Sequence, residues 1–227
     1  MGNHMRSRKI PEEIVQPSGK NQEIKKKGAA REWGEALVVA FILAMIIRAF
    51  LLQAYRIPSS SMEDTLLKGD HILATKYNYG VTMPFTTHKI WGANIVPQRG
   101  DIVIFTFPQN HRMDFVKRVI GLPGDTIAVK NKKVFVNGKE YITGHEKYTD
   151  PYIVTEDPGK VRDNRPELTV QKGHVFVMGD NRDQSYDSRF WGQLPMDNIK
   201  GKALIIYFSW EKSHMQERLT RIGHLVR

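Results

Sequence analysis

The chain has 227 residues, of which 41% are hydrophobic and 26% are charged, a globular composition that suits one domain with appendages. It contains no cysteine, so disulfides, a thiolate nucleophile, cysteine-based zinc sites and cysteine acylation are excluded. The formal net charge of +10 suits anionic lipid headgroups and nucleic acid equally well, so charge alone identifies no partner.

Residues 1–32 show almost no apolar periodicity and are rich in lysine, which predicts a mobile basic tail that could not recover its ordering entropy by packing. Its first four residues precede a second methionine, Met5, and resemble a cloning remnant. The basic residues of the tail are Lys20, Lys25, Lys26, Lys27 and Arg31.

An apolar run from Ala36 to Leu52 is interrupted only by Arg48, and as a helix its roughly 17 residues would be about 26 Å long. With Trp33 and Tyr55 as interfacial anchors, residues 33–55 are predicted to form a transmembrane helix. The alternatives are a buried core helix and a cleaved secretory signal. The run lacks a polar face and no small-x-small site follows it, which favours a retained anchor.

The lysines precede this span, so the positive-inside bias predicts a cytoplasmic amino terminus and a catalytic domain outside the cell membrane. Residues 56–210 form the predicted domain, which is mainly β with antiparallel sheets, because short Val, Ile and Phe segments alternate with turn signals. Predicted strands lie at 71–74, 101–107, 115–120, 126–129, 134–136, 174–178 and 203–208.

Asn137-Gly138 predicts a tight hairpin turn within residues 134–142. Residues 143–172 are polar and contain proline, which predicts a surface excursion, either a small subdomain or a flexible loop. Residues 211–227 form a basic tail in which Leu219, Ile222 and Val226 have helical spacing. The sequence favours neither of two placements for this tail, a helix at the membrane surface or packing against the domain.

The sequence lacks the common catalytic motifs, including G-x-S-x-G, H-E-x-x-H, the phosphate loop and G-x-G-x-x-G, and its histidines lack metal-ligand spacing. A serine nucleophile would therefore need another base, such as a lysine kept neutral by desolvation. Lys117 fits this need, because a strand would place it on one face with Phe115 and Val119. The plainer alternatives are a solvated strand lysine and, for Ser61, the cap of a short helix.

Three segments taken together closely resemble, in order and spacing, the boxes of bacterial type I signal peptidases. They are P-S-S-S-M-E-D-T-L at 58–66, F-V-K-R-V-I-G-L-P-G-D at 115–125 and M-G-D-N-R-D-Q-S-Y-D-S-R at 178–189. The resemblance covers residues 33–210. Glu63-Asp64 departs from it, because the family usually has a less acidic pair ending in proline, and this leaves the turn after Ser61 in doubt.

The resemblance implies a Ser/Lys serine endopeptidase in which Ser61 is the nucleophile and Lys117 the general base. It further implies an oxyanion hole formed by the Ser59 hydroxyl and the Ser61 backbone N–H, with Ser185 orienting the lysine amine. The residues implied to support the site are Asp180, Asp187 and Arg189. Those implied to line shallow apolar pockets for small substrate side chains are Ile57, Pro58, Met62, Leu66, Phe115 and Val116.

The partners implied are secretory precursor proteins with signal peptides and membrane phospholipid, with no nucleic acid, no cofactor and no metal. A calcium loop at Asp180–Trp191 is disfavoured, because Arg182 and Trp191 occupy ligand positions. An apolar rim at 83–85 and 90–91 could enter lipid or be a strand connection. Two other classes stay open: an inactive tethered binding protein on the same fold, and a DNA-binding repressor with a self-cleaving Ser/Lys domain.

Overall fold

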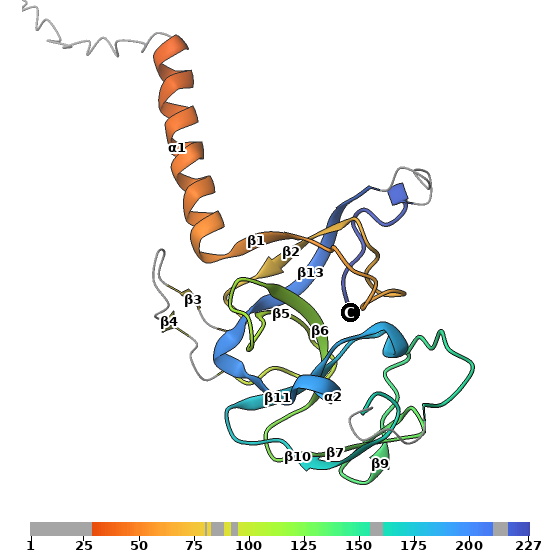
Figure 1. Cartoon of the computed structure of the whole chain (residues 1–227). Helices are drawn as coiled ribbons and strands as arrows, with labels where there is room; N and C mark the ends of the chain where they lie inside the picture. The colour runs from red at the N-terminus through yellow and green to blue at the C-terminus, as the bar shows by residue number, and fades with distance from the viewer. Residues whose placement is uncertain (1–28, 80, 83–88, 92–94, 155–160, 211–217) are drawn as a thin grey trace, which may run out of the picture. The chain divides into compact units, whose positions relative to one another are not determined.

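The computed structural model describes residues 29–79, 81–82, 89–91, 95–154, 161–210 and 218–227. It divides into two compact units, residues 1–41 and residues 42–227 (Figure 1). Residues 1–28 of the predicted tail at 1–32 lie outside the described residues, whereas residues 29–32 begin helix α1. The predicted rim at 83–85 and the side chains at 90–91 also lie outside the described residues.

Helix α1 covers Ala29–Phe50 and exposes large apolar side chains all around its surface, including Leu37, Phe41 and Met45. Within the part of the chain that the structure describes, no helix meets the length and hydropathy needed to cross a membrane. The predicted helix at 33–55 extends too far at its carboxyl end, because helix α1 ends at Phe50. Leu52–Arg56 forms strand β1, which pairs with β2.

The larger sheet is antiparallel and contains seven strands in the order β1-β2-β13-β5-β6-β11-β12 (Figure 1). This order confirms a mainly β, antiparallel fold, and the predicted strands within it form at nearly the expected places. Their bounds are Leu52–Arg56 for β1, Asp70–Thr75 for β2, Ile199–Ser209 for β13, Ile102–Thr106 for β5, Asp114–Gly121 for β6, His174–Met178 for β11 and Leu194–Pro195 for β12.

A second sheet has the order β10-β7-β8-β9, with bounds Arg165–Thr169, Thr126–Lys130, Lys133–Val136 and Lys139–Glu140. The predicted hairpin joins β8 to β9, and Asn137 and Gly138 have φ of 52° and 76°. Two consecutive positive φ values are what a type I′ turn requires, which explains the Asn-Gly pair. A two-stranded ribbon pairs β3 (Val81–Thr82) with β4 (Lys89–Trp91).

Three apolar clusters form the core of residues 42–227. One packs β2, β5 and β13 against Ile57, Met62 and Leu66, so that the segment carrying Ser61 is fixed by its own buried neighbours. A second lies around Phe105 and Val177, and a third joins the small sheet to Ile120 and Phe176. Short helical turns complete the fold: η1 at Arg182–Gln184, α2 at Ser188–Trp191 and η2 at Met196–Asn198.

Within the predicted excursion at 143–172, Arg165–Thr169 forms strand β10, which pairs with β7. The carboxy-terminal segment packs on the domain, since Val226 is 8% exposed within the first core cluster and Leu225 bridges to Ile205. The helical spacing seen in the sequence is misleading here, because Leu219 and Ile222 remain 61% and 42% exposed.

Candidate active site

The segment Ser59–Leu66 is a series of tight turns, so the alternative in which Ser61 caps a short helix does not describe it. Leu66 N–H donates to the Met62 carbonyl at 2.7 Å, and both side chains are almost fully buried. Asp64 has φ of 95°, an unusual conformation for a residue with a side chain and one that proline cannot adopt. The departure from the family pattern thus coincides with a special backbone conformation.

Lys117 lies on β6 and reaches the nucleophile candidate directly, because its Nζ donates to Ser61 Oγ at 2.5 Å. The lysine is 4% exposed, and its amine lies 5.7 Å from the centroid of the Phe115 ring. Burial lowers the pKa of Lys117 to about 8, and Arg189 adds to this effect while Asp187 and Asp180 oppose it. A buried amine in contact with a hydroxyl can accept the hydroxyl proton once it is neutral.

Ser59 and Ser61 have their hydroxyl oxygens 3.3 Å apart, and Ser59 is exposed. The hydroxyl of Ser59 therefore lies beside the atom that would attack a substrate carbonyl. Ser60, between them, donates its hydroxyl to Gln184 Oε1 at 3.2 Å.

Ser185 is 4% exposed, and its hydroxyl makes no hydrogen bond of ordinary geometry to a described residue, although it lies close enough to Asp187 to help lower the pKa of that carboxyl. It packs against Gly179, where any side chain would collide with both Ser185 and the Ser61 carbonyl. A glycine is required at position 179 because the backbone of the third box lies directly against the turn that carries Ser61.

Asp187 and Arg189 form a buried ion pair, with Arg189 Nε 2.9 Å from Asp187 Oδ1. Asp187 also accepts from Gly179 N–H at 3.1 Å. Burial opposes ionisation of Asp187, but Arg189 outweighs it and holds the pKa of this carboxyl below its usual range. The pair fixes the loop that contains Ser185.

Asp180 accepts two hydrogen bonds of 2.7 Å from the guanidinium of Arg118 and one of 2.6 Å from Thr65 Oγ1. The next residue, Asn181, donates its backbone N–H to the Ser61 carbonyl at 3.2 Å and its amide to the Ser60 carbonyl at 3.2 Å. The hydrogen bonds of Asp180 and Asn181 join the third box to the nucleophile turn, residues 59–66. They are made to Thr65 and to the carbonyls of Ser60 and Ser61.

The carboxylates once considered for calcium are all in contact with cations: Asp180 with Arg118, Asp183 with Lys132, and Asp187 with Arg189. Each charge is therefore already balanced by the chain itself.

A cleft of about 350 Å³ opens at Ser61 and Lys117 and is largely apolar. Five of the six predicted pocket residues line it: Ile57, Pro58, Met62, Phe115 and Val116. Leu66 does not, because it is fully buried in the first core cluster beneath the nucleophile turn.

Two strand edges border this cleft. Strand β1 pairs only with β2 among the described strands, and β11 pairs with β6 only from Arg118 to Gly121. The first half of β6, Asp114–Lys117, therefore keeps one edge free. An extended peptide between these edges could form main-chain hydrogen bonds with both.

The sequence reasoning missed several residues that line the cleft or hold the nucleophile turn. Gln184 and Tyr186 lie within the third box and Tyr55 precedes the first, so proximity to the boxes was an available signal. Arg56, Ile104, Met113 and Asp114 also line the cleft, while Thr65, Arg118 and Asn181 hold the turn.

Known proteins resemble this chain over most of its length. Residues 30–210 match the family profile described as "Signal peptidase, peptidase S26". Signal peptidase I of Pseudomonas aeruginosa is 32% identical over an alignment of 232 residues that covers 89% of this chain and 81% of that protein. Signal peptidase I of Aquifex aeolicus is 36% identical, covering 76% of this chain and 82% of the relative.

Among solved structures, the crystal structure of a signal peptidase I from Enterococcus faecalis is 31% identical and covers 47% of this chain and 95% of its own. The TM-score of that pair is 0.39.

Proposed function

This chain belongs to peptidase family S26, the signal peptidases, and we propose that Ser61 and Lys117 are the residues that perform its reaction. Its activity is that of a serine endopeptidase that removes signal peptides from secretory precursors. The observation that supports the assignment is the 2.5 Å contact between Lys117 Nζ and Ser61 Oγ inside a buried site.

The reaction begins when neutral Lys117 takes the proton of Ser61 Oγ as this oxygen attacks the scissile carbonyl carbon. The lysine ammonium then gives that proton to the leaving amine, which departs as the carbon–nitrogen bond breaks. An acyl-enzyme on Ser61 remains. Lys117 next takes a proton from water, the resulting hydroxide attacks the ester, and the returned proton frees Ser61 Oγ. Every proton is thus carried by the same nitrogen.

The oxyanion of each tetrahedral intermediate would accept hydrogen bonds from the Ser59 hydroxyl and the Ser61 backbone N–H. Support comes from the Ser59 hydroxyl, which lies 3.3 Å from Ser61 Oγ at the exposed mouth of the site. Ser185 fits a role in orienting the amine, because its hydroxyl is buried in the loop beside Asp187 and makes no hydrogen bond of ordinary geometry to a described residue. Its loop is held by Asp187 and Arg189.

The substrate would lie extended along the cleft between β1 and β6, with alternate side chains directed into the apolar wall. The resemblance of the three boxes implies small side chains one and three positions before the cut, and the largely apolar lining of the cleft supports apolar ones. Ile57, Met62 and Val116 would form the contacts that exclude larger ones.

Cleavage of a purified precursor by Ser61→Ala and Lys117→Ala proteins tests the dyad. Each variant should lose activity by roughly 10⁴-fold or more, because nucleophile and base act as one unit. Lys139→Ala is the matched control, since this exposed lysine lies on β9, outside the cleft. Activity above a tenth of the parent in either folded variant would refute the assignment.

Ser59 and Ser60 provide a second test within one tripeptide. Ser59→Ala should lower kcat by about 10²-fold with little change in KM, because the lost donor serves the transition state. Ser60→Ala removes only a surface hydrogen bond to Gln184 and should stay within about threefold of the parent. Equal effects of the two changes would count against an oxyanion role for Ser59.

We further propose that the chain is anchored in the cell membrane by its first helical segment. Leu37 and Phe41 of α1 are each 67% exposed, and Ile42 and Leu43 are 52% and 55% exposed, an unfavourable arrangement in water. With the lysine-rich segment before it, the amino terminus would be cytoplasmic, the anchor single-pass and the catalytic domain extracytoplasmic. Precursors and phospholipid would be its partners there.

A further inference from the structure

A segment outside the three boxes, residues 146–150, runs beside the third box. Lys147 is held there through its backbone on both sides. Its N–H donates to the Asp180 carbonyl at 2.8 Å, and its carbonyl accepts from the Arg182 N–H at 2.8 Å. The two bonds form a parallel β-bridge between Lys147 and Asn181. The segment is therefore paired with the loop of the site at the level of the backbone.

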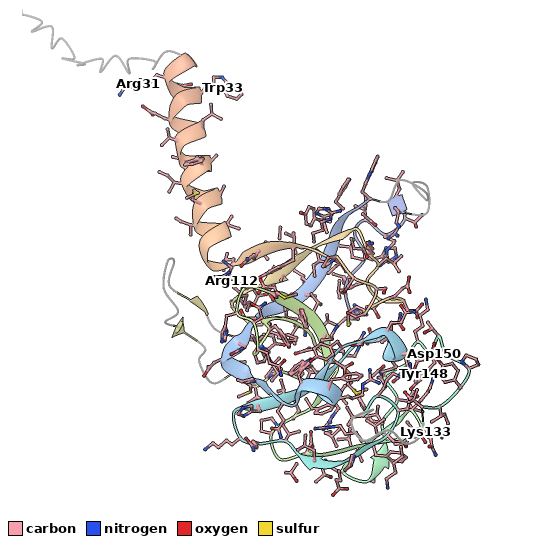
Figure 2. All side chains as sticks on the ribbon, viewed as in Figure 1. Arg31, Trp33, Arg112, Lys133, Tyr148 and Asp150 are labelled. Atoms are coloured by element: carbon pink, nitrogen blue, oxygen red, sulfur yellow. The ribbon has the colours of Figure 1, made fainter. Side chains whose placement is uncertain are left out.

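A carboxylate of the third box fixes the other end of this segment. Asp183 accepts from the backbone N–H groups of Thr149 and Asp150 at 2.9 Å and 2.8 Å, and its side chain is fully buried. Figure 2 shows Tyr148 and Asp150 close together at one side of the domain. Because hydrogen bonds hold the segment at both ends, the backbone of Lys147 has little freedom to move.

The side chain of Lys147 extends from this fixed backbone to the nucleophile turn. Its Nζ lies 3.2 Å from Glu63 Oε2, and the two side chains are 38% and 37% exposed. Glu63 is part of the turn, because its N–H donates to the Ser60 carbonyl at 3.0 Å. The ion pair thus connects the turn to a segment more than eighty positions away in the sequence.

Asn181 gives the same segment a second connection to the nucleophile. Its backbone N–H donates to the Ser61 carbonyl and its side-chain amide to the Ser60 carbonyl, each at 3.2 Å. Lys147 therefore restrains the turn in two ways, through the β-bridge to Asn181 and through the ion pair with Glu63.

The ion pair can act on the position of Ser61 without touching a substrate. The described residues that line the catalytic cleft do not include Lys147 or Glu63. Ser61 Oγ has to stay within reach of Lys117 Nζ, which lies 2.5 Å away. A displacement of reacting groups by about 1 Å can cost about 10²-fold in rate, whereas an exposed ion pair adds little to global stability. The effect of the pair is therefore expected in the rate more than in the free energy of unfolding.

We propose that Lys147 is a positioning residue for the reaction, which through its ion pair with Glu63 holds the nucleophile turn at the distance that Lys117 requires. The inference rests on the proposed dyad of Ser61 and Lys117. It gives a role in the reaction to a part of the chain that lies outside the three boxes.

A charge-swap cycle in the full chain tests the proposal, with steady-state cleavage of a purified precursor as the measurement. Lys147→Glu and Glu63→Lys each replace an attraction by a repulsion and should lower kcat about fivefold, with KM within about twofold of the parent. The double variant restores the attraction and should return kcat to within about twofold, whereas independent effects would multiply to about 25-fold. Lys147→Arg keeps the charge and should rescue most of kcat.

Lys133 and Glu140 provide the matched control pair. Their N–O distance is also 3.2 Å, their side chains are 61% and 38% exposed, and they lie on β8 and β9, outside the third box. Lys133→Glu should leave kcat unchanged and should lower the urea midpoint of unfolding as little as Lys147→Glu does. A clearly lower midpoint for Lys147→Glu would show an ordinary structural pair and would overturn the proposal.

Two further outcomes bear on the positioning role. Salt at about 1 M should reduce the difference in kcat between the parent and Lys147→Glu, because it screens an exposed ion pair. A kcat of Lys147→Glu within twofold of the parent, or a double variant no faster than the singles, would refute the role of Lys147. Ser61→Ala separates the two levels of the argument: an inactive Ser61→Ala protein with no coupling in the cycle rejects the positioning role alone, and an active one rejects the dyad.

Discussion

At the scale of the residue, the amine of Lys117 is the proposed general base, so we expect its protonation state to set the reaction rate. Because burial lowers its pKa to about 8, roughly a tenth of the molecules hold it neutral at pH 7. We expect kcat/KM to rise about tenfold per pH unit below this value and to level off above it. Cleavage of a short uncharged peptide between pH 6 and 10 measures the profile, and a flat curve would contradict the role of Lys117.

The same shift makes a stability prediction with a definite sign. The folded pKa of Lys117, about 8, lies below the ordinary value of 10.5, so the unfolded chain binds more protons between these two values. The contribution of Lys117 to the free energy of unfolding therefore increases as pH rises through this window, by about 3 kcal/mol in total. Lys117→Met should remove this increase and be the more stable protein at pH 7, which denaturant titration at several pH values measures.

At the scale of the element, the carboxy-terminal segment acts as a support for the nucleophile turn. Arg221 Nη2 lies 2.7 Å from Asp70 Oδ2 and donates to the Thr65 carbonyl at 2.9 Å. Asp70 is fully buried and also accepts from Ser209 Oγ at 2.6 Å. Thr65 is four positions after Ser61, so the carboxy-terminal segment bonds to the backbone of the turn itself.

We expect Arg221→Gln to lower the free energy of unfolding by about 1–3 kcal/mol, because Asp70 would lose part of its compensation. The turn would also loosen, so kcat should fall more than KM rises. Urea titration and steady-state kinetics measure the two effects. Lys139→Gln, an exposed change on β9, is the control, and Arg221→Gln with wild-type stability and kcat would disprove the support role.

At the scale of the whole molecule, we expect residues 1–41 to locate the protein at the membrane and residues 42–227 to perform the reaction. Every residue of the proposed site lies within the unit 42–227. Removing residues 1–41 should therefore leave kcat/KM on a short soluble peptide within about twofold. It should slow cleavage of a precursor embedded in vesicles by about 10-fold or more, because tethering raises effective concentration.

The same pair of proteins tests the anchor. The full chain should stay in the membrane fraction at alkaline pH, and the truncated one should be released in part. If both proteins cleave the embedded precursor equally well, residues 1–41 have no part in presenting the substrate.

The sequence by itself determined the fold class, the predicted strands and the Asn137-Gly138 turn, because alternation and turn chemistry are local properties of a chain. It also contains Ser61 and Lys117 in two separate segments, and the resemblance of these segments to a known family implied a role for each residue. Predictions from the local sequence pattern were wrong where tertiary contacts compete with local conformational preference. The apolar run continues into strand β1, and the spacing of Leu219, Ile222 and Val226 gave way to packing of Val226 in the core.

Only the tertiary structure decided which groups meet. The contact between Ser61 and Lys117 spans 56 positions and depends on β6 packing against the segment that carries Ser61. Three other features likewise depend on residues distant in sequence. They are the burial of Leu66, the close approach of Gly179 to the Ser61 carbonyl and the hydrogen bond from Arg221 to the Thr65 carbonyl. Burial also sets the pKa of Lys117, because desolvation depends on how the surrounding segments pack, a property that no short stretch of sequence contains.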